Sequence, residues 1–201
     1  MKKYWRFIVM WIAGLALVAC SDDDSNSWYL PVDEAWRETN VNAFEQRAND
    51  EGIEYINSQS NNGRILYKVL KKGEGTEQIY YTSQVECYYK GCFIADENGN
   101  YIQNRDSVLS QGEVFDSALR ENDDDPALMT GGATINYGNK KLGTTDGFAT
   151  ALQHMHVGDV WEVWIPYSLG YGVNGNVNGT DTIKPYTTLV YQIEVADIVE
   201  Q

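Results

Sequence analysis

Histidine is the scarcest reactive residue in this sequence, with only His154 and His156 among 201 residues. The stretch Asp146–Met155 has apolar residues at helical spacing, which predicts a short helix. His154 lies near the end of this stretch, and His156 directly follows it. Side chains two residues apart on a helix point to nearly opposite sides, so the pair is not expected to hold one metal ion. We interpret both histidines as surface residues at the helix C-terminus, with a functional pair as the less favoured alternative. The sequence shows no Ser-His-Asp or Cys-His set, which argues against nucleophilic catalysis.

Cysteine is nearly as rare, with three residues in all, Cys20, Cys87 and Cys92. The last two lie five residues apart in VECYYKGCF, a run typical of an extended strand. At ~3.3 Å per residue their Cα atoms would be about 16 Å apart, which is too far for a disulfide. We therefore expect two free thiols, both buried.

Basic residues are few, since 15 lysines and arginines face 29 aspartates and glutamates and leave a net charge of −14. An acidic surface repels the phosphate backbone of nucleic acids and the headgroups of anionic lipids. Nucleic acid is thus excluded as an expected partner, and any membrane attachment is expected to depend on acyl chains.

Long hydrophobic runs are also missing, because the apolar stretch Phe7–Ala19 has only thirteen residues. It follows a basic head and is too short to span a bilayer comfortably, so residues 1–19 are predicted to be a signal peptide. The adjoining LVAC resembles the lipobox of bacterial lipoproteins, which implies cleavage before Cys20 and lipidation of that cysteine. An ordinary signal peptide with an incidental cysteine is the alternative. Since the three charged residues removed are basic, the net charge would fall from −14 to −17.

The polar segment 20–30 includes Ser21–Asp24, which resembles the acidic export tag of surface lipoproteins in Bacteroidota. This resemblance implies a lipid anchor in the bacterial outer membrane, on the cell surface, with the periplasmic face as the alternative. A simple solvated tether explains the same residues and is compatible with either location.

The rest of the chain divides into a helical N-terminal appendage, residues 31–62, and a main domain, residues 63–201. The spacing of apolar residues predicts a helix over 31–49, which we expect to pack on the main domain because Trp36 and Phe44 would otherwise be exposed. A partner-binding surface is the alternative. In the main domain, alternating residues predict strands near 65–70, 85–89, 114–115, 160–165 and 189–195. The expected fold class is α+β, with an antiparallel sheet wrapped over one short helix.

Five consecutive segments resemble the FKBP-type peptidyl-prolyl cis/trans isomerases, in the family's own order: LYKVLKKGEG, CYYKG, GEVFDSA, GFATALQHMHVGDVWEVWIPYSLGYG and PYTTLVYQIEV. Together they cover about residues 64–199. The resemblance implies an FKBP-like fold and a folding catalyst or chaperone that acts on X-Pro bonds of exported polypeptides. It implies no metal and no cofactor, and we expect a monomer.

By the same resemblance, the catalytic positions are Tyr89, Asp116 and Tyr171, and the substrate-binding positions are Phe115, Thr145, Phe148, Ile183 and Tyr191. Tyr171 would donate its hydroxyl to the carbonyl before proline, and Phe148 would form the floor of an apolar pocket. Thr145 would offer its backbone N–H to the substrate. Such a site needs no nucleophile, because it accelerates rotation by favouring the twisted amide over the planar one.

Among the positions that depart from the family pattern, three bear on the function: Phe148 in place of tryptophan, Thr145 in place of an aliphatic residue, and Ala133 near a usual pocket aromatic. They favour an alternative function, a non-catalytic module that binds extended peptide or a protein partner at the cell surface. One further motif, DENGN at Asp96–Asn100, resembles the start of a calcium loop. Tyr101 occupies the position that requires glycine and Ser107 the position that requires glutamate, so we predict an Asn-Gly hairpin there.

Overall fold

The central feature of the fold is a seven-stranded antiparallel sheet, seen in a computed structural model that describes residues 30–132, 135–137, 140–142, 144–176 and 182–200. The strand order is β1-β2-β8-β9-β3-β4, and β5 pairs with the other half of β3. These strands are β1 (Glu54–Asn57), β2 (Arg64–Lys71), β3 (Gln84–Cys92), β4 (Val114–Ala118), β5 (Ala127–Thr130), β8 (Val160–Ile165) and β9 (Leu189–Glu200). β6 (Ile135–Tyr137) and β7 (Lys140–Leu142) form a separate hairpin.

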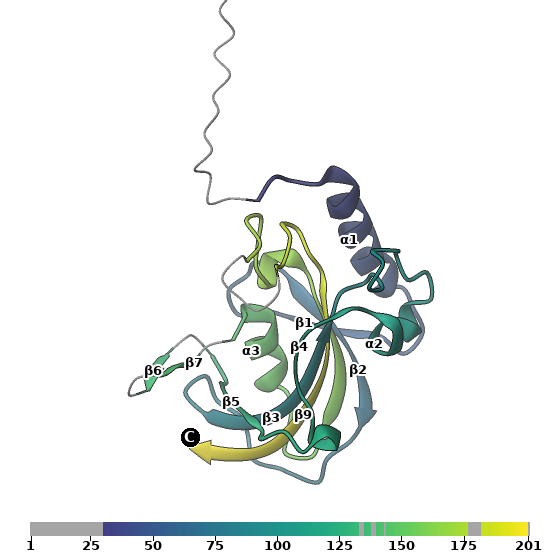
Figure 1. The fold of residues 1–201 in the computed structure, drawn as a ribbon. Helices are drawn as coiled ribbons and strands as arrows, with labels where there is room; N and C mark the ends of the chain where they lie inside the picture. The colour runs from purple at the N-terminus through teal and green to yellow at the C-terminus, as the bar shows by residue number, and fades with distance from the viewer. Residues whose placement is uncertain (1–29, 133–134, 138–139, 143, 177–181, 201) are drawn as a thin grey trace, which may run out of the picture.

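Helices lie on both faces of this curved sheet (Figure 1). The longer ones are α1 (Glu34–Arg47) and α3 (Asp146–Leu152), and the short ones are α2 (Val108–Gln111), η1 (Arg105–Ser107), η2 (Arg120–Asn122) and η3 (Tyr167–Leu169). The α+β class with an antiparallel sheet over a short helix is confirmed. Among the described residues, no helix is both long and apolar enough to cross a membrane.

The alternation of side chains along each strand gives the sheet two buried faces. On β8, Val163 and Ile165 point into a core shared with α3, whereas Trp164 points into a second core under α1 and α2. We call these the α3 face and the α1 face. The α3 face carries most of the aromatic core and the candidate site.

Helix α3 begins at its N-cap Thr145 and ends at Leu152, so the predicted helix over 146–155 extended three residues too far. Met155 is nonetheless fully buried, as its spacing indicated. His154 is exposed, with Nδ1 2.8 Å from the carbonyl oxygen of Thr150. Both histidines lie just beyond the helix, and His156 is half-buried, which corrects its prediction as a surface residue. Within the described residues, no group of three or more His, Cys, Asp or Glu is placed to hold a metal ion.

Helix α1 packs on the sheet, and the expectation that it would do so is confirmed. Its N-cap Asp33 accepts a hydrogen bond from the backbone N–H of Trp36. The buried positions are Asn40, Ala43, Phe44 and Arg47, so two of the four are polar. The predicted apolar stripe was therefore incomplete, because polar side chains with distant partners occupy half of the buried face.

Three smaller features complete the comparison with the sequence. The segment 54–57 was predicted as part of a helical appendage but forms β1, which extends the main sheet next to β2. Cys87 and Cys92 are free and buried, as expected. The Asn-Gly hairpin is also confirmed, since Ala95 pairs with Tyr101 in an antiparallel bridge.

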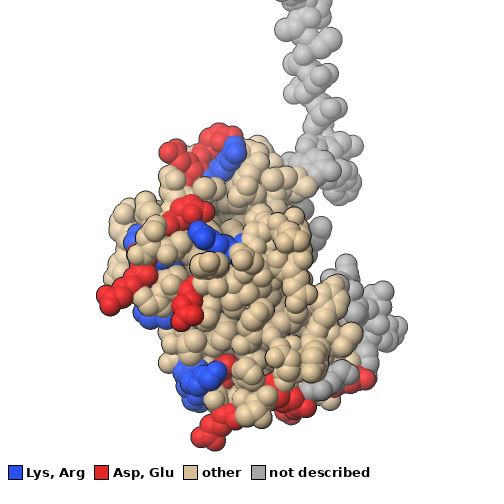
Figure 2. Space-filling view, turned by 180° about the vertical axis from the view of Figure 1, so that it is seen from behind, with Lys and Arg blue, Asp and Glu red and all other residues tan. Residues whose placement is uncertain are grey.

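The face shown in Figure 2 carries charged side chains of both signs. Described lysines and arginines lie there next to acidic residues and form no separate basic area on this face.

Candidate functional site

The candidate site is built around Gly91 on β3, at a point where backbone and side chains come unusually close. Gly91 pairs with Asp116 on β4 and with Tyr191 on β9. A Cβ atom at this position would lie 2.6 Å from Cζ of Phe115 and 2.7 Å from Cε1 of Tyr191. Only glycine leaves room for both rings, so the two aromatic side chains meet directly above the strand.

Three rings form the apolar floor of the site. The centroids of Phe115 and Tyr191 are 5.5 Å apart at 86°, and those of Phe148 and Tyr191 are 5.2 Å apart at 89°. These edge-to-face arrangements are favourable for aromatic pairs. Helix α3 supplies Phe148, which is only 3% exposed. The result is a rigid apolar surface made from two strands and one helix.

A hydrogen-bonded pair forms one side of the rim. The hydroxyl of Tyr89 donates to Oδ2 of Asp116 at 2.8 Å, and the Tyr89 ring meets Phe148 edge-on at 6.0 Å. Burial, and then the hydrogen bond to Asp116, raise the pKa of Tyr89. Its hydroxyl therefore stays protonated and remains a donor.

Tyr171 is half-buried and packs against the same aromatic core. Its hydroxyl is hydrogen-bonded to the side chain of Asn176, whose backbone pairs with Ile183 through two 2.8 Å hydrogen bonds. Burial, followed by the charge of Asp116, raises the pKa of Tyr171. The hydroxyl is thus neutral, and Ile183, 4% exposed, belongs to the same buried core as the rings of the floor.

Thr145 sits at the N-terminus of α3 and is half-buried. Its side chain caps the helix by accepting a hydrogen bond from the backbone N–H of Phe148 at 3.4 Å. The threonine that departs from the family pattern therefore fixes the start of the helix that carries the aromatic floor. Its donation of a backbone N–H to substrate stays a prediction.

The structure brings together all eight residues singled out in the sequence. Five share one buried core, Tyr171 packs on it, Asp116 binds Tyr89, and Thr145 caps α3. Ala133, named among the departures, lies outside the described residues, as does Cys20.

Sequence reasoning missed two aromatic residues that extend the floor. Phe93, 8% exposed, lies 4.9 Å from Phe115 between centroids. Trp36, from α1, meets Phe93 edge-on at 6.2 Å. Phe93 directly follows the CYYKG motif and Cys92, so the motif could have indicated it. No local signal links Trp36 to Phe93, because the two residues lie more than fifty positions apart in the chain.

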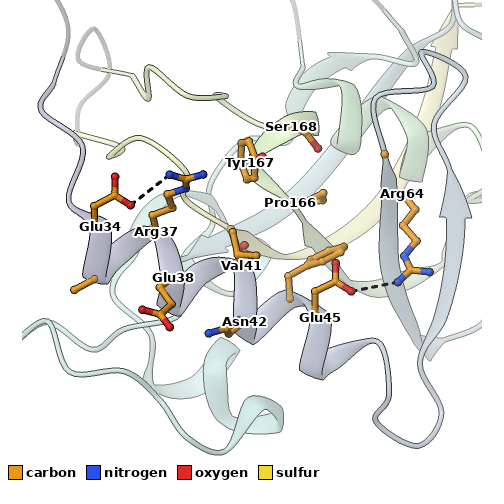
Figure 3. Close-up of a pocket in the computed structure, with 14 residues that line it drawn as sticks. Glu34, Arg37, Glu38, Val41, Asn42, Glu45, Arg64, Pro166, Tyr167 and Ser168 are labelled. Atoms are coloured by element: carbon orange, nitrogen blue, oxygen red, sulfur yellow. Dashed lines mark hydrogen bonds and ion pairs between the residues drawn. The ribbon is translucent and has the colours of Figure 1, made fainter.

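A separate cavity of about 960 Å³ lies alongside α1 (Figure 3). It lies between the helix and the segment Pro166–Ser168. Both of its arginines are already paired, Arg37 with Glu34 at 3.3 Å and Arg64 with Glu45 at 3.6 Å. None of the eight candidate residues lines it, so it is distinct from the aromatic site.

Comparison with known proteins connects this geometry to a family. Residues 75–196 match the family model described as FKBP-type peptidyl-prolyl cis-trans isomerase. The chain belongs to the FKBP family. The matched segment contains all eight candidate residues but excludes α1, β1 and β2.

Two curated relatives and two solved structures are similar to the chain. The FKBP-type 22 kDa peptidyl-prolyl cis-trans isomerase of Escherichia coli is 28% identical over 79% of this chain. The aligned part spans 59% of that relative's length. The macrophage infectivity potentiator of Trypanosoma cruzi is 25% identical over 98% of this chain and 85% of its own. A Pseudomonas syringae peptidyl-prolyl cis-trans isomerase structure has a TM-score of 0.58 at 22% identity, covering 86% of this chain and 98% of that one. The crystal structure of FkpA from Escherichia coli has a TM-score of 0.55 at 22% identity, covering 83% of this chain and 62% of that one.

Proposed function

We propose that this FKBP-family chain catalyses cis/trans isomerisation of X-Pro peptide bonds in polypeptides. The observation that carries the proposal is the floor of perpendicular rings above Gly91, bordered by the hydroxyls of Tyr89 and Tyr171. Such a surface offers a prolyl ring an apolar contact and offers the neighbouring carbonyl a donor. Membership of the family supports the same function over a purely binding role.

The chemistry requires only differential binding. Rotation about the amide bond meets a barrier of ~18–20 kcal/mol because resonance is lost at the twist. The twisted amide has less charge separation than the planar one, so an apolar surface stabilises it relative to the planar form. Each ~1.4 kcal/mol of preference for the twisted state gives about a tenfold gain in rate.

The polar groups at the rim have distinct tasks in this proposal. Tyr171, already oriented by Asn176, donates to the carbonyl that precedes proline. Asp116 holds the hydroxyl of Tyr89 and keeps it from competing for that carbonyl. Because burial raises the pKa of both tyrosines, no negative phenolate forms beside the rotating amide near neutral pH. Neither a metal nor a cofactor has a step in this mechanism.

The direct test is a protease-coupled assay on a tetrapeptide that contains proline, with Phe148→Ala as the matched variant. Wild-type protein should accelerate isomerisation, and Phe148→Ala should lose most of that acceleration. Loss of the ring also costs about 3–5 kcal/mol of stability, so folding must be verified by circular dichroism. No acceleration by wild-type protein at micromolar concentration would reject the isomerase and leave the peptide-binding module.

We also propose that the chain is a bacterial lipoprotein, anchored through Cys20 in the outer membrane at the cell surface, and that it acts as a monomer on exported clients. Support comes from the short apolar run, the LVAC sequence and the polar segment that follows it. Cys20→Ala should abolish incorporation of labelled fatty acid and release the protein from membranes. Acylation of the Cys20→Ala variant would contradict the proposal.

A further inference from the structure

One turn of α1 contacts the segment Lys184–Thr188 of the main domain. This segment connects two residues of the candidate site, because Ile183 precedes it and Tyr191 follows it on β9. Any displacement of the segment would therefore move both residues. Three contacts from α1 hold it, and a fourth contact from the same helix reaches the aromatic floor.

The first contact is made by Trp36. Its indole Nε1 donates to Oγ1 of Thr187 at 2.9 Å, and the same hydroxyl donates to the carbonyl oxygen of Lys184 at 2.7 Å. The ammonium of Lys184 also lies 4.9 Å from the centroid of the Trp36 ring. One indole thus contacts both ends of a tight turn, through a hydroxyl and through a cation–π contact.

The second contact is a pair of buried hydrogen bonds between Asn40 and Thr188. Oδ1 of Asn40 accepts from the backbone N–H of Thr188 at 2.8 Å, and the backbone oxygen of Asn40 accepts from the threonine hydroxyl at 3.0 Å. Both residues are at most 1% exposed. Buried groups left unpaired would be costly, so this pairing fixes α1 relative to the start of β9.

The third contact involves a strained residue. Tyr186 has φ of 60°, in the left-handed region that side chains other than glycine rarely adopt. Its ring lies 4.8 Å from that of Tyr167 and 4.5 Å from the guanidinium of Arg37. In Figure 3, Arg37 extends from α1 toward Tyr167, and both residues line the cavity described above. The helix therefore helps to hold a conformation that the backbone alone does not favour.

The fourth contact leads to the aromatic floor itself. The Trp36 ring packs edge-on against Phe93, and Phe93 packs on Phe115, which meets Tyr191 above Gly91. Trp36 thus touches the site by two independent routes, one through the backbone of 184–188 and one through aromatic packing.

We propose that Trp36 is a positioning residue for isomerisation, which makes the N-terminal helix a working part of the active site. The inference rests on the proposed function, but it concerns a residue outside the segment 75–196 that matches the family model. Trp36 fixes Ile183, Tyr191 and Phe115 in the arrangement that fits the twisted amide. Its loss leaves a site that admits proline but fits the transition state less well.

The test compares Trp36→Ala with Phe44→Ala in the full-length protein. Both residues lie on α1, but Phe44 belongs to the core of the α1 face, whereas Trp36 packs on the core that contains the aromatic floor. Measured well below the unfolding temperature, Trp36→Ala should lower kcat/KM about tenfold, mainly through kcat, because small errors in positioning are costly for rate. Phe44→Ala should lower the unfolding temperature and leave kcat/KM unchanged.

Two further variants separate positioning from packing. Trp36→Phe keeps a ring against Phe93 but removes the indole N–H, so it should retain an intermediate kcat. Thr187→Val removes the acceptor, and its effect should not add to that of Trp36→Phe. If Trp36→Ala keeps the kcat/KM of the wild type, or if Phe44→Ala loses as much kcat/KM as Trp36→Ala, the inference is overturned. The proposed isomerase function would not be affected by either result. An inactive wild-type protein would instead reject the proposed function itself.

Discussion

The two faces of the sheet are both buried, but they are stabilised by opposite kinds of chemistry. On the α3 face, neutral aromatic rings pack at right angles, and the tyrosines keep their protons. On the α1 face, Arg47 is 1% exposed and binds three carboxylates, those of Glu162, Asp106 and Asp50, at 2.6, 2.9 and 3.1 Å. The buried network of ionised groups thus lies on the other side of the same strands, whereas the aromatic site carries one carboxylate, that of Asp116, at its rim.

This separation follows from the alternation of residues along β8. Glu162 and Trp164 point to the α1 face, where the indole Nε1 donates to the carboxylate at 2.7 Å, and Val163 between them points to the α3 face. A shift of one residue in register would place the carboxylate among the rings. The charged network therefore depends on the same register that builds the site.

The largest effect is expected from breaking the charged face. Arg47→Met removes the cation and leaves Glu162, itself 6% exposed, as an unpaired buried charge. Loss of one partner from a buried ion pair costs about 3–5 kcal/mol. Urea unfolding should show this loss, whereas kcat/KM of the folded fraction should be unchanged.

A double variant sharpens this result. Adding Glu162→Gln removes the stranded charge but keeps an oxygen that can accept from Trp164, so part of the stability should return. If Arg47→Met with Glu162→Gln is no more stable than Arg47→Met alone, the cost does not arise from an uncompensated charge.

A smaller effect, on turnover rather than on stability, is expected on the aromatic face. Tyr171→Phe removes one hydroxyl from a half-buried ring, and a hydrogen bond contributes ~0.5–1.5 kcal/mol. Turnover should fall by roughly three- to tenfold, with little change in the free energy of unfolding. If Tyr171→Phe is inactive while Phe148→Ala folds and turns over normally, hydrogen bonding rather than the apolar floor drives catalysis.

The smallest effect concerns acid pH. Hydrogen bonds from Arg105 lower the pKa of Asp50, and partial burial opposes this effect only in part. The pKa of Asp50 therefore stays below its ordinary value of 3.8. A carboxyl with a lowered folded-state pKa stabilises the protein above that ordinary value and loses its contribution as the pH falls through the folded-state pKa. Asp50→Asn should therefore cost about 1 kcal/mol or less at neutral pH, since the pair is partly solvated. The difference from wild type should shrink below pH of about 4, and an unchanged difference would contradict this assignment.

The parts of the structure that the sequence predicted are those with a local signal. Alternating residues located β8 and β9, and the spacing around Phe148 located α3, because periodic apolar residues report directly on a buried face. Motif order then placed Tyr89 and Tyr171 in one site. These signals sufficed for the fold class and the family.

The parts that were missed depend on partners far away in the chain. Asn40 and Arg47 are buried because Thr188 and Glu162 satisfy them, and no local pattern reveals such pairs. For the same reason Trp36 was read only as an apolar position on a helix. Short β1 lacked a run long enough to distinguish it from the preceding helix, and it gains its stability from pairing with β2.

The two thiols on β3 have a consequence for measuring how the molecule opens. Cys87 is 0% exposed near the middle of the sheet, and burial raises the pKa of its thiol well above the ordinary value. A thiol reagent needs both access and a thiolate, so it is expected to react only after β3 has separated from β9. The rate of alkylation would then report the population of molecules in which the central pairing has opened. The wild-type sequence thus carries its own chemical probe of global unfolding.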